Sequence, residues 1–172
     1  MGRDKANLRL GGRTLVGNIR ATSRQLGFPV RVIRRDLVKR CGPLGGVYTA
    51  LKTTNAAAVL FLSCDMPFVS AELIDRVVTK LSARRKAVFV IASELIGFPF
   101  VLRRETLPVV EAQLKARQFS VHALARKLNA TVMRLPPRHR HELFNINTRA
   151  DWSHARELWR RLNNKHPQGW RR

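Results

Sequence analysis

The sequence predicts an α/β protein in which helices cover both faces of a mostly parallel sheet. Three observations predict this class. Short apolar segments alternate with segments of helical periodicity along most of the chain. Their spacing leaves room for the helical crossovers that parallel strands need. The 172 residues, 45% of them hydrophobic, are enough for one domain with a buried core, and we expect residues 1–172 to form a single domain.

The expected strands are short apolar runs bounded by turn-forming residues. Residues 57–62 are continuously apolar, which predicts a strand buried on both faces. The other expected strands are residues 30–33, 88–91, 98–102 and 131–135. In a parallel sheet covered by helices, ligands bind at the carboxyl ends of the strands. That edge is where we look for functional residues.

The expected helices carry apolar residues three and four positions apart. This pattern is clear in residues 71–81, where Ser70 stands at the position of an N-cap. The other expected helices are residues 14–26, 47–52, 105–116, 120–128 and 149–162. Residues 136–141 are expected to be a polar connector, and residues 165–172 a loose basic tail.

Basic residues dominate the charge, because 33 Lys and Arg against 11 Asp and Glu give a formal net charge of +22. A positive field of this size attracts polyanions of any kind. The sequence has no RNA-binding aromatic pair and no basic block interleaved with stacking aromatics, so we do not expect nucleic acid as the partner. The longest apolar run, residues 56–62, is far shorter than the ~20 residues that cross a bilayer. We expect a cytoplasmic protein without a membrane partner.

Asp65 follows the apolar run of residues 57–62, which places it where the predicted strand ends. A carboxylate there can hold Mg²⁺, which takes few protein ligands and completes its octahedron with phosphate oxygens and water. Alternatively, Asp65 caps the helix near Ser70 or forms a turn before Pro67. The residues alone leave these alternatives open.

Two further segments have both a functional and a plain structural interpretation. Residues 42–46, Gly-Pro-Leu-Gly-Gly, precede a helical pattern, and glycines there let the backbone approach a ligand. The same segment is also compatible with a connecting turn, and most glycine-rich turns only connect elements. Asn145 and Asn147 could present two amides to a polar substrate, whereas Asn147 or Thr148 could also be the N-cap of the last helix.

Four segments in a fixed order are more specific than any one of them. They are Met1-Gly2-x-Asp4-Lys5, Asp36 with residues 42–46, Cys64-Asp65-Met66-Pro67, and Asn145-Ile146-Asn147-Thr148. Together they resemble the molybdenum cofactor guanylyltransferase family of nucleotidyltransferases over nearly the whole chain. The resemblance implies a Rossmann-like, three-layer α/β/α fold. It also implies transfer of GMP from Mg·GTP to molybdopterin, which forms a guanine dinucleotide cofactor and releases pyrophosphate.

The resemblance implies a role for each matched residue. Lys5 would contact the nucleotide phosphates and Asp65 would bind Mg²⁺, so these two are the expected catalytic residues. Asn145 and Asn147 would lie near the second substrate or help to complete the metal site. The implied nucleotide-binding residues are Gly2, Lys5, Asp36, Gly42, Pro43, Leu44 and Asp65. GTP and molybdopterin are the implied substrates, and molybdoenzymes or their chaperones are the implied protein partners.

The sequence departs from the family pattern in two places. The family has a strand and a glycine-rich loop before its Met-Gly-x-Asp-Lys, whereas this chain starts at that methionine. We therefore expect Met1 to be internal to a longer natural protein and activity to require the upstream segment. Residues 26–30 also leave no room for a strand and helix that the family has there. Two alternatives stay open: a nucleotidyltransferase with another nucleotide or acceptor, and a non-catalytic basic α/β protein that binds nucleic acid.

Overall fold

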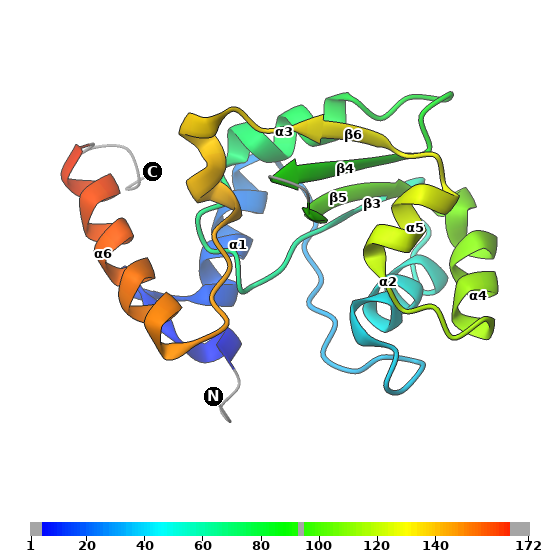
Figure 1. Ribbon diagram of the computed structural model, residues 1–172, viewed down its shortest axis with the longest axis horizontal. Helices are drawn as coiled ribbons and strands as arrows, with labels where there is room; N and C mark the ends of the chain where they lie inside the picture. The colour runs from blue at the N-terminus through cyan, green and yellow to red at the C-terminus, as the bar shows by residue number, and fades with distance from the viewer. Residues whose placement is uncertain (1–4, 93–94, 166–172) are drawn as a thin grey trace.

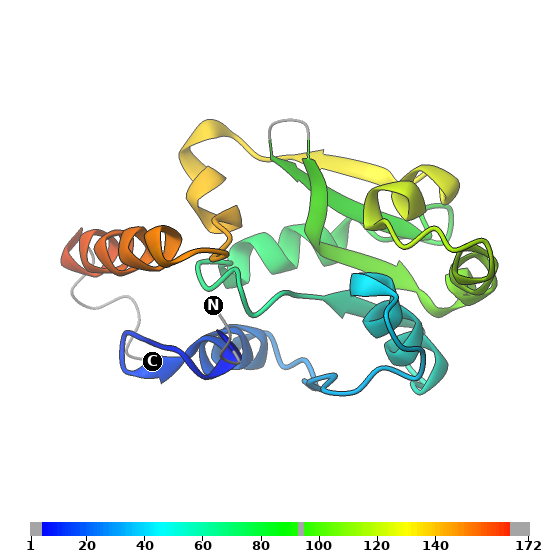
Figure 2. The same ribbon diagram turned by 60° about the horizontal axis from the view of Figure 1, so that its bottom comes forward.

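A four-stranded sheet with helices on both faces organises the chain in the computed structural model, which describes residues 5–92 and 95–165 (Figures 1 and 2). The strands are β3 (Ala58–Phe61), β4 (Ala87–Ala92), β5 (Leu95–Arg103) and β6 (Thr131–Arg134). Their order across the sheet is β3-β5-β4-β6. Gly2 and residues 166–172 of the expected tail lie outside the described residues.

The prediction of a mostly parallel sheet is wrong. Among the described strands of this sheet, only β4 and β6 pair in parallel, because β5 lies between β3 and β4 and runs antiparallel to both. The reason is the length of the connection between β4 and β5. Strand β4 ends at Ala92 and β5 begins at Leu95, and a connection this short cannot form the crossover that parallel strands need. Since β3 and β4 are both antiparallel to β5, strands β3, β4 and β6 still point the same way. Their carboxyl ends share one edge of the sheet.

Two hydrophobic clusters fill the two faces of the sheet. The first packs α2 (Gly42–Lys52), α4 (Leu107–Lys115) and α5 (Val121–Lys127) against one face of β4, on which Phe89 stacks with Phe100 of β5 at 4.6 Å. The second packs α1 (Leu15–Gln25) and α3 (Ala71–Thr79) against Val88 and Val90 on the opposite face. The alternation along β4 thus produces the α/β/α layers (Figure 1).

Several predicted elements are present with small shifts at their ends. Ser70 and Ser120 cap α3 and α5, since their hydroxyl oxygens accept from the backbone N–H groups of Leu73 and Ala123. The predicted helix at residues 105–116 is a 3₁₀ turn, η2 (Arg104–Thr106), followed by α4. The polar connector is a 3₁₀ helix, η3 (Pro137–Leu143), and the last helix is α6 (Arg149–Lys165).

Three local predictions are wrong. Residues 30–33 form no strand, because no described strand lies beside them to form a ladder and Arg31 instead donates to the Thr53 carbonyl. Strand β3 is half-buried over most of its length, because it is an edge strand that only β5 pairs. Gly42 is already the first residue of α2, because Pro43 in the first turn favours helix entry, so residues 42–46 belong to the helix.

A third cluster lies beyond the carboxyl ends of the strands. It joins the amino-terminal segment, which contains η1 (Lys5–Asn7) and the hairpin of β1 (Arg9–Leu10) and β2 (Arg13–Thr14), to α6. Phe68 and Ile146 are buried members of this cluster, and the loop between β3 and α3 passes through it. This cluster packs together three chain segments that are distant in sequence.

Within the described residues, no helix is long and apolar enough to cross a membrane.

Candidate active site

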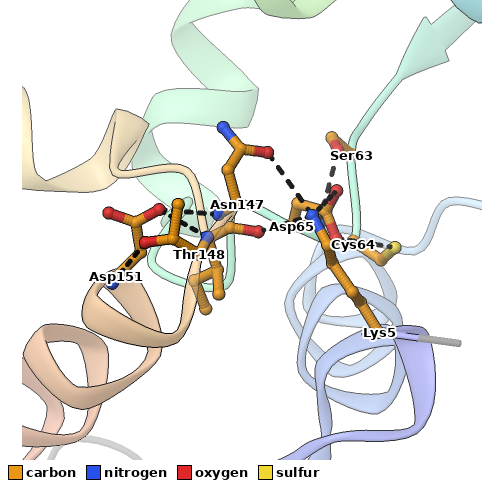
Figure 3. Close-up of polar contacts among 8 residues, drawn as sticks. Lys5, Ser63, Cys64, Asp65, Asn147, Thr148 and Asp151 are labelled. Atoms are coloured by element: carbon orange, nitrogen blue, oxygen red, sulfur yellow. Dashed lines mark hydrogen bonds and ion pairs between the residues drawn. The ribbon is translucent and has the colours of Figure 1, made fainter. Parts of the chain in front are cut away.

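Lys5, Asp65 and Asn147 come together at the carboxyl end of β3 (Figure 3). Lys5 belongs to η1, Asp65 to the loop after β3, and Asn147 to the segment before α6. The backbone N–H of Ile146 donates to the Asp65 carbonyl at 2.9 Å, and the Ile146 side chain is fully buried in the third cluster. Packing of Ile146 therefore places its neighbour Asn147 beside Asp65.

Three oxygen atoms surround the Lys5 ammonium group. The Nζ atom lies 3.0 Å from the Ile146 carbonyl oxygen, 3.4 Å from Asn147 Oδ1 and 3.8 Å from Asp65 Oδ2. The side chains of Lys5 and Asp65 are 25% and 27% exposed, so both are partly accessible to solvent. We call Ile146 O, Asn147 Oδ1 and Asp65 Oδ2 the oxygen cradle. Carboxylate, amide and carbonyl oxygens are the donors that Mg²⁺ prefers, and here a side-chain cation already lies among them.

The first turn of α6 holds Asn147 by its backbone. Asp151 Oδ2 accepts from the N–H groups of Asn147 at 2.9 Å and Thr148 at 2.7 Å. In return, Thr148 Oγ1 accepts from the N–H of Asp151 at 3.1 Å, which completes a reciprocal cap. The two backbone donors, the Thr148 hydroxyl and then the charge of Lys5 hold the pKa of the Asp151 carboxyl below its usual value. Thr148 is thus the residue that caps the helix, and the Asn147 side chain is free to face Lys5.

Asp65 lies in a turn and does not cap α3, since Ser70 fills that position. Its N–H donates to Ser63 Oγ at 3.3 Å, and Met66 closes the turn by donating to the Ser63 carbonyl. The turn directs the Asp65 carboxylate toward Lys5 (Figure 3). Of the two structural alternatives, a turn before Pro67 is correct, and it leaves a carboxylate oxygen available to a ligand.

Asp36 forms a second group with the first turns of α2. A Cβ atom added to Gly45 would lie 2.8 Å from Asp36 Oδ2, and one added to Gly46 would lie 3.6 Å from Oδ1. The Asp36 carboxylate therefore lies directly against the helix. Gly42 and Pro43 are exposed there, but the Leu44 side chain is fully buried in the first cluster, so only its backbone can meet a ligand.

The structure keeps these two groups apart. Helix α2 lies away from η1 and the start of α6 in both ribbon views (Figures 1 and 2). Asn145 is exposed and contributes no atom to the oxygen cradle. Among the described residues, no group of three or more His, Cys, Asp or Glu side chains could hold a metal ion. A metal here would depend on Asp65, an amide oxygen and substrate oxygens.

A cavity of about 260 Å³ lies elsewhere, between the β1–β2 hairpin, α1 and α6. Arg13, Asn18, Trp159 and Asn163 are among its lining residues, and none of the predicted site residues is. The cavity therefore does not coincide with the oxygen cradle.

Sequence reasoning missed two acidic residues near the cradle. The cap by Asp151 had a signal, because Thr148 and Asp151 are spaced as a reciprocal cap requires. Glu142 had none: it directly follows the predicted polar connector of residues 136–141, in a stretch for which no element was predicted, yet it is only 5% exposed. Its contacts are described below.

Comparison with known proteins identifies the family. Residues 1–132 match the family described as the MobA-like NTP transferase domain. The chain belongs to this family. The match includes Lys5, Asp36, the start of α2 and Asp65, whereas Asn145 and Asn147 lie beyond it.

Named relatives extend the comparison along the chain. Over 115 residues the chain is 31% identical to a probable molybdenum cofactor guanylyltransferase of Flavobacterium johnsoniae, and the alignment covers 66% of this chain and 60% of that protein. Over 168 residues it is 29% identical to a molybdenum cofactor guanylyltransferase of Xanthomonas euvesicatoria pv. vesicatoria, with 89% and 86% covered. The chain thus spans about three fifths of the first relative and most of the second.

Solved structures share the fold of this MobA-like nucleotidyltransferase. Molybdopterin-guanine dinucleotide biosynthesis protein A of Archaeoglobus fulgidus superposes with a TM-score of 0.72 at 18% identity, covering 93% of this chain and 92% of that one. A 2-C-methyl-D-erythritol 4-phosphate cytidylyltransferase of Thermus thermophilus superposes with a TM-score of 0.68 at 20% identity, covering 91% and 93%. Rv0371c of Mycobacterium tuberculosis, solved with manganese, superposes with a TM-score of 0.63 at 16% identity, covering 91% of this chain and 93% of that one.

Proposed function

We propose that the protein transfers GMP from Mg·GTP to molybdopterin, which forms a guanine dinucleotide and releases pyrophosphate. Membership of the MobA-like family and the names of its relatives support this proposal. The observation that carries it is the oxygen cradle, because it gathers one carboxylate, one amide and one carbonyl oxygen around the Lys5 ammonium group at the carboxyl end of β3.

The residues of the cradle have the right chemistry for an in-line displacement at the α-phosphorus. Such a reaction needs no side-chain nucleophile, so catalysis consists of positioning two anions and neutralising the charge of the leaving pyrophosphate. Asp65 and the Asn147 amide oxygen would hold Mg²⁺, which supplies that charge neutralisation when bound. Lys5 would exchange cradle oxygens for phosphate oxygens when the nucleotide binds, since its ion pair with Asp65 is long at 3.8 Å.

Asp36 and the first turns of α2 would hold the nucleoside. The exposed carboxylate accepts hydrogen bonds only, and guanine presents two neighbouring N–H donors on one edge. Gly42 and Pro43 leave the backbone at the start of α2 exposed to the ligand. Asn145, exposed next to the cradle, would meet the second substrate.

The test is release of pyrophosphate from GTP with Mg²⁺ and molybdopterin, measured for this chain and for one extended by its upstream codons. We expect molybdopterin-dependent release in at least one of them. Asp65→Asn should lower kcat/KM by about 10²–10³, the usual effect of removing one electrostatic group from a catalytic site. The matched control is Asp75→Asn, an exposed aspartate of α3 that should leave turnover unchanged. Absence of release in both chains, or equal effects of the two substitutions, would contradict the proposal.

A second candidate is nucleotidyl transfer with a different nucleotide or acceptor. The fold is compatible with this candidate, because it also superposes on the cytidylyltransferase of Thermus thermophilus. Turnover measured with CTP, ATP and UTP separates the two, since our proposal expects a clear preference for GTP. DNA binding that is lost between low and moderate salt, with no turnover of any nucleotide, would instead support the nucleic-acid alternative.

A further inference from the structure

We propose that Glu142 is a positioning residue of the oxygen cradle, and this inference rests on the proposed function of that site. Glu142 lies in η3 and is almost fully buried. Burial of a carboxylate is costly unless hydrogen bonds satisfy its oxygens. The contacts of this side chain therefore show what its burial achieves.

Both carboxylate oxygens of Glu142 are satisfied by donors. Oε2 accepts from the Ser70 N–H at 3.1 Å and from the Ser70 hydroxyl at 2.5 Å. Oε1 lies 2.8 Å from Nδ1 of His139. Because Arg138 Nε donates to His139 Nε2 at 3.1 Å, we assign the ring proton to Nδ1, which donates to Glu142. The Glu142 side chain thus connects η3 to Ser70, the N-cap residue of α3.

The two segments joined by Glu142 are the segments that carry the cradle. Ser70 lies five residues after Asp65, and Glu142 lies five residues before Asn147. A second bond, from the Ile146 N–H to the Asp65 carbonyl, joins the same segments at the cradle itself. The Glu142 contact and the Ile146 bond therefore close a bracket around Phe68, whose ring packs 6.3 Å from that of Phe144.

This bracket fixes the separation of the Asp65 carboxylate and the Asn147 amide oxygen. Without the Glu142 contact, the segment before α6 would depend on the Ile146 bond to the Asp65 carbonyl, on apolar packing and on the contacts of Lys5 and Asp151 to keep its place beside the β3–α3 loop. Displacement of a ligand by about 1 Å can lower activity by about 10²-fold. Partners that orient metal ligands contribute about 10–100-fold to metal affinity. Glu142 touches neither metal nor nucleotide and acts through Asp65 and Asn147.

The substitution Glu142→Gln tests this role, because it keeps the size of the side chain but places an amide donor opposite the donor His139 or Ser70. We expect hydrogen exchange of the Ile146 amide to become at least about tenfold faster relative to the amides of α2, and Mn²⁺ affinity to weaken by about tenfold. The control is Glu111→Gln, which breaks an exposed ion pair with Lys52 between α4 and α2 and should change neither quantity.

A lower melting temperature with unchanged Ile146 exchange would overturn the inference, since Glu142 would then be merely structural. If wild-type protein binds no Mn²⁺ but Glu142→Gln still accelerates Ile146 exchange, the metal role of the site fails while the positioning role stands. If Glu142→Gln does not fold, His139→Ala provides the second test. It removes only the Oε1 partner, so we expect the same shifts at smaller size, and no shift would overturn the inference.

Discussion

Alanine at Gly45 and alanine at Gly46 should affect stability in opposite directions. Both glycines lie inside α2, where alanine is favoured over glycine by about 1 kcal/mol. At Gly46 the added Cβ would meet only Asp36 Oδ1 at 3.6 Å, an ordinary contact. Gly46→Ala should therefore stabilise the protein by about 0.5–1 kcal/mol.

At Gly45 the added Cβ would lie 2.8 Å from Asp36 Oδ2 and 3.3 Å from the Val38 carbonyl oxygen. The carboxylate can swing away but the backbone of Val38 must shift, and such overpacking costs about 1–3 kcal/mol. After subtraction of the helix preference, Gly45→Ala should destabilise the protein by about 0–2 kcal/mol. Urea unfolding of both variants measures the difference in the free energy of unfolding, expected to be about 0.5–3 kcal/mol. Equal stabilities would refute the close approach of Asp36 to α2.

Two further predictions concern the core and the helix cap. Phe89→Ala should lower the free energy of unfolding by about 3–5 kcal/mol, because Phe89 is fully buried and stacked on Phe100. In the same urea experiment, the control Val132→Ala, at an exposed position, should change the free energy of unfolding by no more than about 0.5 kcal/mol. Asp151 has a lowered pKa in the folded protein, so its stabilising contribution is complete above its ordinary value of 3.8 and is lost as the pH falls through the folded value. The stability difference between wild type and Asp151→Ala, measured from pH 7 to pH 3, should therefore shrink at the acidic end; a constant difference would contradict the cap.

Local signals predicted most elements of the fold but not how they pair. Helix α3 could be predicted together with its cap Ser70, because both depend on residues close in sequence. The direction of β5 could not, since the alternation of helices and strands suggested crossovers throughout while the short step from Ala92 to Leu95 requires antiparallel pairing. Residues 30–33 have the composition of a strand but lack a partner, and no local pattern shows that.

The sequence likewise indicated the local features of the candidate site but not the contacts between its distant segments. The position of Asp65 after a strand follows from local pattern, and the turn that holds it is local too. Its proximity to Lys5 and Asn147 depends on packing around Ile146, more than a hundred residues away from Lys5, and came only from family resemblance. Glu142 escaped notice because its role depends on Ser70, a partner that the sequence does not indicate.

The most direct test of the central claim is GTP-dependent pyrophosphate release with Mg²⁺ and molybdopterin, compared between each chain length and its Asp65→Asn variant. Our account predicts release that requires molybdopterin and falls by about 10²–10³ in the variant, because Asp65 would hold the metal that neutralises the leaving group. Release that persists unchanged in Asp65→Asn would contradict the assignment of the oxygen cradle as the reaction centre.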